Sequence, residues 1–233
     1  MIKAVIFDLD NTLVDFMRMK ENAIDAAVDA MIDAGLKLDR ETAREKIFEI
    51  YEKEGIEDQT VFDKFLLSEF NEIDYKIHAA GVVGYRRAKT ASMVLYPHIN
   101  LTLIELAKRG LKLGVVSDAP RKQVWLRLCE LNLHHIFHVV VAFDDTGKKK
   151  PSPAPFTKAL SLLRVKPDQS MMVGDWAERD VNGALKIGMK TVFARYGNVF
   201  GTVHSGAHYE IDDIIGLLEI VDQENDKSRN RHR

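Results

Sequence analysis

The sequence predicts an α/β protein with a Rossmann-like parallel sheet, helices on both faces of the sheet, and an inserted α-helical cap domain. Short apolar, β-rich runs alternate with helical patterns along most of the chain, and one long helical block separates the first run from the others. Strands that alternate with helices through short turns are typical of parallel sheets. The 233 residues are enough for one such domain carrying a smaller one.

Five apolar runs are expected to form buried strands, because each is short, continuous and bounded by polar or turn-forming residues. They are Lys3–Phe7, Leu111–Val116, Val139–Phe143, Ser170–Val173 and Thr191–Ala194. Helical patterns with apolar residues three and four positions apart lie between these runs. Gly110 and Gly188 are well placed to end two of the helices.

The segment from about Val14 to Tyr96 contains no convincing buried strand. One amphipathic helical stripe is predicted before Gly35, and further helices at residues 43–51, 61–70 and 75–93. The stripe consists of Ile24, Ala27, Val28, Met31 and Ile32. We therefore expect a discontinuous core at residues 1–14 and 96–222 and a helical cap at 15–95. The polar tail at 223–233 lacks apolar periodicity, so we expect it to be flexible.

The bulk composition is that of a soluble protein. The formal net charge is −2, from 33 basic and 35 acidic residues, so no basic footprint for nucleic acid is present. No apolar run approaches the ~20 residues that cross a bilayer, and the N-terminus does not resemble a secretory signal. The single cysteine, Cys129, excludes an intrachain disulfide and is expected to be buried. We expect a cytoplasmic protein with no nucleic-acid or membrane partner; its oligomeric state stays open.

Polar side chains follow the predicted strands at the points where the strands end. They are Asp8 and Asp10 after the first strand, Ser117 and Asp118 after the second, Lys150 in the loop after the third, and Asp175 and Asp180 after the fourth. Open parallel sheets bind ligands at the carboxyl ends of their strands, so we expect these residues to converge on one edge.

Several carboxylates at one place repel each other unless a cation is bound. Mg²⁺ prefers carboxylate oxygens and retains several waters, so it is the expected cofactor, with Asp8 and Asp175 as natural side-chain ligands. Three of the segments that carry these polar residues could, taken alone, have a purely structural role. Residues 8–12 could form only a strand-ending turn, residues 117–118 only a helix cap, and residues 148–150 only a solvated loop.

Four segments together resemble the motifs of the haloacid dehalogenase superfamily. They are DLDNTLV at residues 8–14, VVSD at 115–118, KPSP at 150–153 and GDWAERD at 174–180. The segments occur in the family order, each after a predicted strand, and the helical block resembles the cap of that family. The resemblance covers the core from about residue 2 to residue 200, and the cap by position and class only.

The resemblance implies roles for the residues that match its motifs. Asp8 would be the nucleophile that forms an aspartyl phosphate, and Asp10 would be the general acid and base. Ser117, with Asp118 and nearby backbone amides, would hold phosphate oxygens. Lys150 would neutralise charge on the nucleophile and the phosphoryl group.

The same resemblance implies a metal site. Asp8 and Asp175 would ligate Mg²⁺ through their side chains, and Asp10 through its backbone carbonyl. Asp180 would ligate the metal or orient its waters. Trp176, which replaces the small polar residue more usual in this family, would either line the cleft or pack beneath the cap.

An acid at position 10 favours phosphoryl transfer over dehalogenation, since a leaving alcohol needs a proton. We therefore expect a Mg²⁺-dependent hydrolase of phosphoric monoesters that acts on a small phosphorylated metabolite, because a helical cap excludes bulky ligands. The chain resembles archaeal members described as glyceraldehyde 3-phosphate phosphatases. A phosphoglycolate phosphatase and a phosphomutase of the β-phosphoglucomutase type remain alternatives, and a non-catalytic binding protein is disfavoured.

Overall fold

The computed structural model describes residues 1–230, and the chain folds into two compact units. One unit contains Met1–Asp15 together with Val94–Arg233, and the other contains Phe16–Met93. The first unit holds all the strands of the described residues, and the second is helical. We refer to them below as the core unit and the helical unit.

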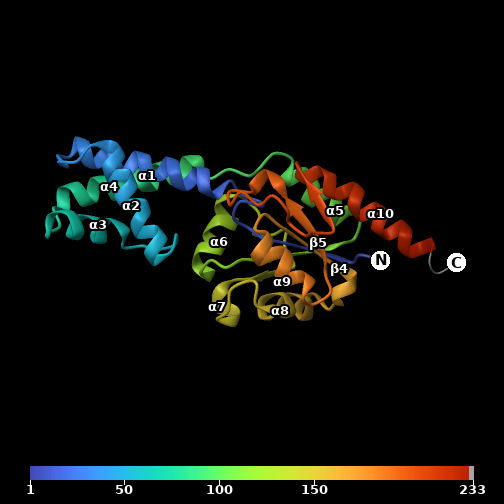
Figure 1. The fold of residues 1–233 in the computed structure, drawn as a ribbon. Helices are drawn as coiled ribbons and strands as arrows, with labels where there is room; N and C mark the ends of the chain where they lie inside the picture. Colours follow the sequence, from blue (N-terminus) through green and yellow to red (C-terminus); the bar gives the residue numbers. More distant parts are fainter. Residues whose placement is uncertain (231–233) are drawn as a thin grey trace. The chain divides into compact units, whose positions relative to one another are not determined.

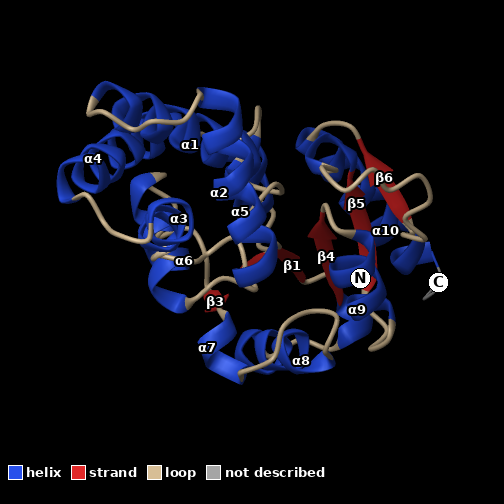
Figure 2. Cartoon of the chain, turned by 60° about the vertical axis from the view of Figure 1, so that its left-hand side comes forward, coloured by secondary structure: helices blue, strands red, loops and turns tan. Residues whose placement is uncertain are grey.

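The core unit contains one parallel sheet (Figure 2). Within residues 1–230 the sheet has six strands in the order β3-β2-β1-β4-β5-β6. Their bounds are β1 Ala4–Phe7, β2 Lys112–Val116, β3 Val139–Val141, β4 Ser170–Gly174, β5 Lys190–Ala194 and β6 Tyr209–Ile211. Every pair of neighbours runs parallel, which confirms the predicted α/β class.

Strand β1 lies at the centre of the sheet, and its register determines what stands beside Asp8. Phe7 is paired with Val115 on β2 and with Val173 on β4. The Asp8 backbone N–H donates to the Val173 carbonyl at 2.9 Å. The residues that follow β1, β2 and β4 therefore emerge next to one another at one edge of the sheet.

Helices cover both faces of the sheet (Figure 1). On one face, α8 (Pro153–Leu163) and α9 (Asn182–Leu185) bury their apolar residues against Ala4, Ile6 and Met172. Side chains alternate along a strand, so Val5 and Phe7 point to the opposite face, where α5 (Ile99–Lys108) packs on β2 and α10 (Leu217–Asn230) packs on α5. Helices α6 (Arg121–Glu130) and α7 (Phe143–Thr146) complete this unit.

The helix ends of the core unit follow the glycine pattern of the sequence. Gly110 and Gly188 have φ values of 75° and 83°, in the left-handed region that glycine adopts without a steric penalty. Between β4 and α9 the chain forms a π-helical turn, η2 (Ala177–Val181), which the sequence pattern did not predict.

The helical unit consists of α1 (Phe16–Asp33), α2 (Arg40–Glu54), α3 (Val61–Phe70) and α4 (Tyr75–Ser92). The four predicted helices of this block are confirmed. The stripe on α1 is buried in a cluster with residues of α2 and α3, while Asp39 and Asp74 cap the N-termini of α2 and α4. Among the described residues, none of the helices combines the length and the apolarity that a membrane crossing requires.

Three features of the structure differ from what the sequence analysis predicted. The third strand ends at Val141, because Phe143 begins the short helix α7. The last strand, β6, was not predicted, since it has only three residues and one of them is the exposed Glu210. Cys129 is exposed, because the buried face of α6 is formed by other positions.

Residues 223–230, where we expected the start of a flexible tail, continue helix α10. Side-chain contacts hold this part of the helix to the core unit. Tyr209 donates to Glu224 at 2.5 Å, and the backbone N–H of Ile2 donates to Asn225 at 2.6 Å. These contacts link distant parts of the chain, so the local sequence pattern does not reveal them. The expectation for residues 231–233 lies outside the described residues.

Candidate active site

Three aspartates gather at the carboxyl edge of the sheet. Asp8 follows β1, Asp175 follows β4, and Asp180 lies in the turn η2. One carboxylate oxygen from each residue lies within 4.8 Å of the others, and all three side chains are almost entirely shielded from solvent. Residues 167 positions apart in the sequence thus share one small volume, as the sheet topology requires.

Lys150 joins two of these aspartates. Its Nζ donates to Asp8 Oδ1 at 2.5 Å and to Asp180 Oδ1 at 2.6 Å. A third bond runs from Nζ to the carbonyl of Val116, the last residue of β2, at 3.1 Å. The lysine side chain is only 3% exposed, so its charge is directed at the aspartates rather than at solvent.

Electrostatics at the site are dominated by burial and by like charges. The pKa of Asp8 is raised from 3.8 to about 8, mainly by burial; Lys150 lowers it, and the charges of Asp180 and Asp10 add to the rise. Burial, with the charge of Asp8, also raises the pKa of Asp175 well above its ordinary value. Burial alone would lower the pKa of Lys150, but the carboxylates of Asp180 and Asp8 raise it, which keeps the amine protonated.

The donor set at this edge fits a divalent cation. Three carboxylates face one ammonium, so full ionisation of the group would leave two negative charges uncompensated in a buried place unless a cation is bound. Lys150 and Thr12 each engage one oxygen, on Asp8 and Asp175 respectively, and among residues 1–230 the second oxygen of each carboxylate is left for another ligand. Hard oxygen donors in this number suit a cation such as Mg²⁺ that keeps part of its water shell.

Asp10 lies apart from the three-aspartate group and has a different partner. Its Oδ2 accepts a hydrogen bond from Arg127 Nη1 at 3.1 Å. The Asp10 side chain is 21% exposed, whereas that of Arg127 is 2% exposed. The acid expected from the sequence to transfer protons is therefore more accessible than the aspartates around Lys150.

The residues after β2 hold their own turn and the Lys150 loop in place. The Ser117 hydroxyl accepts from the Ala119 backbone N–H at 3.2 Å, as in a turn cap, and can still donate its proton. Asp118 accepts from the Lys150 backbone N–H at 2.8 Å and from Arg179 at 3.1 Å. These contacts favour a role for Asp118 in holding the Lys150 loop rather than in touching a phosphate, which would be repelled by its charge.

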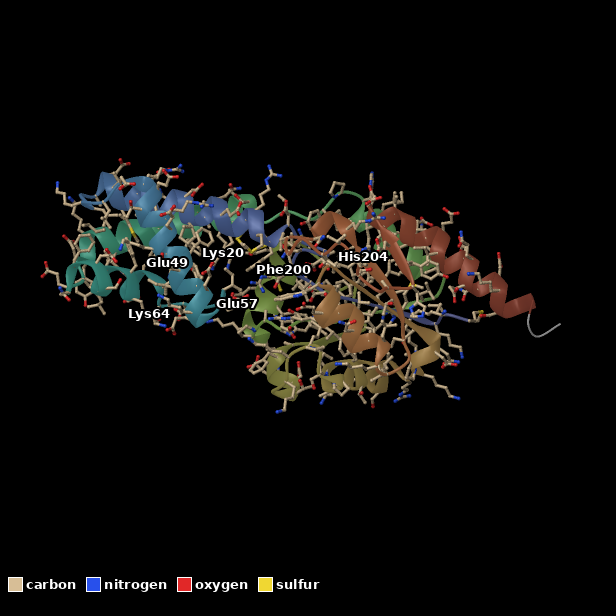
Figure 3. The ribbon with its side chains drawn as sticks, viewed as in Figure 1. Lys20, Glu49, Glu57, Lys64, Phe200 and His204 are labelled. Carbon is tan, nitrogen blue, oxygen red and sulfur yellow. The ribbon has the colours of Figure 1, made fainter. Side chains whose placement is uncertain are left out.

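An aromatic stack lies beside this network. Trp176 stacks on Phe200 with ring centroids 3.8 Å apart, and the Arg179 guanidinium lies 3.6 Å from the Trp176 ring centroid. Phe200 is half exposed and is labelled in Figure 3. The stack fixes Arg179, and through it Asp118, so Trp176 packs within the core unit itself.

The turn after β5 contacts the loop that carries Asp10 and Thr12 and holds it in place. Thr12 donates to Asp175 at 2.8 Å, and its carbonyl accepts from Tyr196 Oη at 2.8 Å. Gly197 approaches the same loop so closely that a Cβ there would lie 1.7 Å from the Asn11 carbonyl oxygen. Only glycine permits this contact.

Replacing Gly197 with alanine should therefore displace the Asn11–Thr12 loop. Because a backbone carbonyl cannot move aside as a flexible side chain does, we expect a loss of about 1–3 kcal/mol in unfolding free energy and a clear fall in activity. Urea unfolding and steady-state kinetics measure both effects. Gly216→Ala, at a glycine of the same unit whose added Cβ would meet no atom closer than 3.4 Å, is the matched control. Equal behaviour of the two variants would show that the contact has no consequence.

Comparison with known proteins places this arrangement in a family. The model for the haloacid dehalogenase-like hydrolases matches residues 5–194. The chain belongs to this family. It is 35% identical to the glyceraldehyde 3-phosphate phosphatase of Pyrococcus furiosus, over 99% of this chain and 98% of that protein. It is 38% identical to the glyceraldehyde 3-phosphate phosphatase of Methanopyrus kandleri, over 84% and 85% of the two chains.

A solved structure supports the same assignment. The crystal structure of a haloacid dehalogenase (HAD) phosphatase from Thermococcus onnurineus has a TM-score of 0.70 and 28% identity. It covers 94% of this chain and 98% of that one. Membership of the haloacid dehalogenase-like hydrolases confirms the resemblance drawn from the four motifs and identifies the protein as a hydrolase.

The motifs of this hydrolase family did not reveal every residue near the site. Arg127, Tyr196 and Gly197 lie far in sequence from the residues they touch. One signal for Arg127 was present, since it occupies a helix position three residues after the apolar Val124. Within the helical unit, separately from this site, the motifs also did not reveal the buried Lys20 (Figure 3). Its Nζ lies 3.1 Å from Tyr85 Oη and 3.9 Å from the Tyr51 ring centroid.

Proposed function

We propose that the protein is a Mg²⁺-dependent phosphatase that hydrolyses a small phosphorylated metabolite through a phosphorylated Asp8. The observation that carries this proposal is the buried group of Asp8, Asp175 and Asp180 around Lys150. Such a group combines a carboxylate nucleophile, a fixed cation and donors for a divalent metal. A two-step phosphoryl transfer through an aspartyl phosphate uses all three, since its catalysis rests on a nucleophile, positioning and charge stabilisation.

In the first step a carboxylate oxygen of Asp8 attacks phosphorus and the bond from phosphorus to the leaving oxygen breaks. Asp10 donates a proton to that oxygen, so the alcohol leaves neutral. Lys150 stays protonated throughout and stabilises the charge on Asp8 and on the phosphoryl group. The product of this step is an acyl phosphate on Asp8.

In the second step a water oxygen attacks phosphorus, and Asp10, now ionised, accepts the water proton. The bond between Asp8 and phosphorus breaks, which releases inorganic phosphate and restores the carboxylate. When bound by Asp8, Asp175, Asp180 and the Asp10 carbonyl, Mg²⁺ would supply charge neutralisation for the phosphoryl oxygens. Ser117 would donate its hydroxyl proton to one of those oxygens.

For the substrate we propose glyceraldehyde 3-phosphate. The support is the similarity to two archaeal proteins named as phosphatases of that compound, over 99% and 84% of this chain. A small ester suits an enzyme with a helical insert after its first strand, since such inserts shield the site from water and bulky ligands. We propose that the enzyme acts in the cytoplasm on free metabolites.

Removal of the metal should abolish activity. We expect hydrolysis of 4-nitrophenyl phosphate to fall to background in excess chelator and to return on addition of Mg²⁺, because two buried negative charges would otherwise repel the phosphate dianion. Phosphate release with and without chelator measures this. Ca²⁺ serves as the comparison cation, since its larger and more flexible coordination shell should support far less turnover. Full activity in chelator would refute the metal assignment.

A panel of phosphate esters separates the candidate activities. We expect the largest kcat/KM for glyceraldehyde 3-phosphate, with phosphoglycolate as the main competitor to be ranked against it. Glucose phosphates should yield inorganic phosphate or remain unchanged, without isomerisation. Phosphate release and chromatography of the sugars measure the two outcomes. Rapid isomerisation of a glucose phosphate would instead identify the protein as a phosphomutase.

A further inference from the structure

The inner face of α6 contains an arginine where an apolar residue is usual. Val124, Arg127 and Leu128 are the buried residues of this helix, spaced three and four positions apart as on the core-facing side of an amphipathic helix. Arg127 is only 2% exposed. A buried guanidinium is costly unless a partner compensates its charge, so this residue requires an explanation beyond packing.

The explanation lies at the end of β1. Arg127 Nη1 contacts Asp10 Oδ2 at 3.1 Å, and the two residues are 117 positions apart in the sequence. The guanidinium is held by the packing of α6, while Asp10 is on a loop and partly exposed. The rigid member of the pair is therefore Arg127, and it determines where the Asp10 carboxylate lies.

We propose that Arg127 is a positioning residue for Asp10, which holds this carboxylate in the orientation that proton transfer needs. The inference rests on the proposed function, because it assigns a helper to the acid and base of that reaction. Without Arg127, the partly exposed Asp10 side chain would sample other rotamers. Asp10 would then spend less time within reach of the leaving oxygen.

Arg127 and Asp10 have different roles in this pair, because only Asp10 can give up and accept a proton. Arginine has only donors and does not give up its proton in proteins, so Arg127 cannot replace Asp10 as the acid. Its Nη1 contacts Asp10 Oδ2, so it acts on this carboxylate as a permanent donor. Arg127 thus orients the carboxyl group that exchanges a proton with the leaving alcohol and, later, with the attacking water.

Leaving groups of different basicity test this role. An alkoxide needs a proton in order to leave, whereas 4-nitrophenolate does not, and kcat/KM reports the steps up to the loss of the leaving group. For Arg127→Met we expect kcat/KM to fall about 10- to 100-fold for glyceraldehyde 3-phosphate and less than about threefold for 4-nitrophenyl phosphate. Arg127→Lys should recover part of the lost activity, because it retains a donor at this position.

Two further variants complete the experiment. Arg121→Met removes an exposed arginine from the first turn of the same helix, where it pairs with Asp145, and should leave both substrates unaffected. In an Asp10→Asn background, Arg127→Met should change kcat/KM by less than about twofold, because the group that it positions has lost its proton chemistry. Thermal unfolding of every variant records any loss of fold.

An equal loss on both substrates, or a further loss in the Asp10→Asn background, would overturn the inference and leave Arg127 a merely structural residue. Failure of Arg127→Lys to recover any of the leaving-group selectivity of the wild type would do the same. These outcomes differ from failure of the proposed function. In that case the wild-type protein with Mg²⁺ would hydrolyse neither ester, or Asp8→Asn would hydrolyse both.

Discussion

Replacing Asp8 with asparagine is expected to abolish phosphate-ester hydrolysis while the fold stays intact. The amide of asparagine has almost the same shape but is not a nucleophile toward phosphorus, so no acyl phosphate can form. Loss of an enzyme nucleophile lowers kcat by many orders of magnitude, and here we expect at least about 10⁴-fold. Phosphate release from glyceraldehyde 3-phosphate at saturating Mg²⁺ measures the effect.

The same variant should be at least as stable as the wild type in the absence of metal. Burial, together with the neighbouring carboxylates, raises the pKa of Asp8 and makes its charge costly. Removal of the carboxylate therefore relieves this cost, while Lys150 can still donate to the amide oxygen. Thermal unfolding in chelator tests this. Asp168→Asn, at an exposed aspartate of the same unit, is the control and should retain full activity. Residual hydrolysis by Asp8→Asn above a few per cent would remove Asp8 from its proposed role.

Replacing Lys150 with methionine should impair both activity and stability. Methionine has a similar length but no charge, so Asp8 and Asp180 would lose the ammonium that both contact. Breaking a buried ion pair from one side typically costs about 3–5 kcal/mol, and we expect a loss of that order in unfolding free energy without metal. Activity should fall by about 10³-fold, because charge stabilisation of the phosphoryl group is lost.

Lys149 provides a matched control for this experiment. It is the exposed neighbour of Lys150, so Lys149→Met changes the net charge identically without touching the aspartates. Urea unfolding and steady-state kinetics of the two variants are compared side by side. Lys150→Met with the stability and kcat of Lys149→Met would contradict the assignment of Lys150 as the cation of the site.

Much of the core unit could be predicted because each buried parallel strand is visible in the sequence as a short apolar run. Strands β1, β2 and β4 are continuous apolar runs that end at polar residues, and their burial on both faces allows no other pattern. The edge strand β6 lacks that signal, since it is short and partly exposed. The helical continuation of residues 223–230 also has no local signal, because contacts such as Ile2 with Asn225 stabilise it from another part of the chain.

Some residues of the candidate site could also be predicted from the sequence, and others could not. Asp8, Asp175 and Asp180 could be expected together, because each lies at or just beyond the end of a central strand. The supporting residues could not. Arg127 reaches Asp10 across 117 positions, and Gly197 touches Asn11 only because the turn after β5 folds back on the loop. Such contacts depend on the tertiary structure, and sequence spacing carries no record of them.

The central claim is that Asp8 carries the phosphoryl group, and trapping this intermediate tests it most directly. The enzyme would be quenched in acid during turnover of 4-nitrophenyl phosphate with Mg²⁺, and the acyl phosphate reduced with borohydride. Peptide mass spectrometry then locates the modified residue. We expect Asp8 to be converted to homoserine in the wild type, and no conversion in Asp8→Asn. Modification of a different residue, or an unmodified Asp8 in an enzyme quenched at full turnover, would contradict the account.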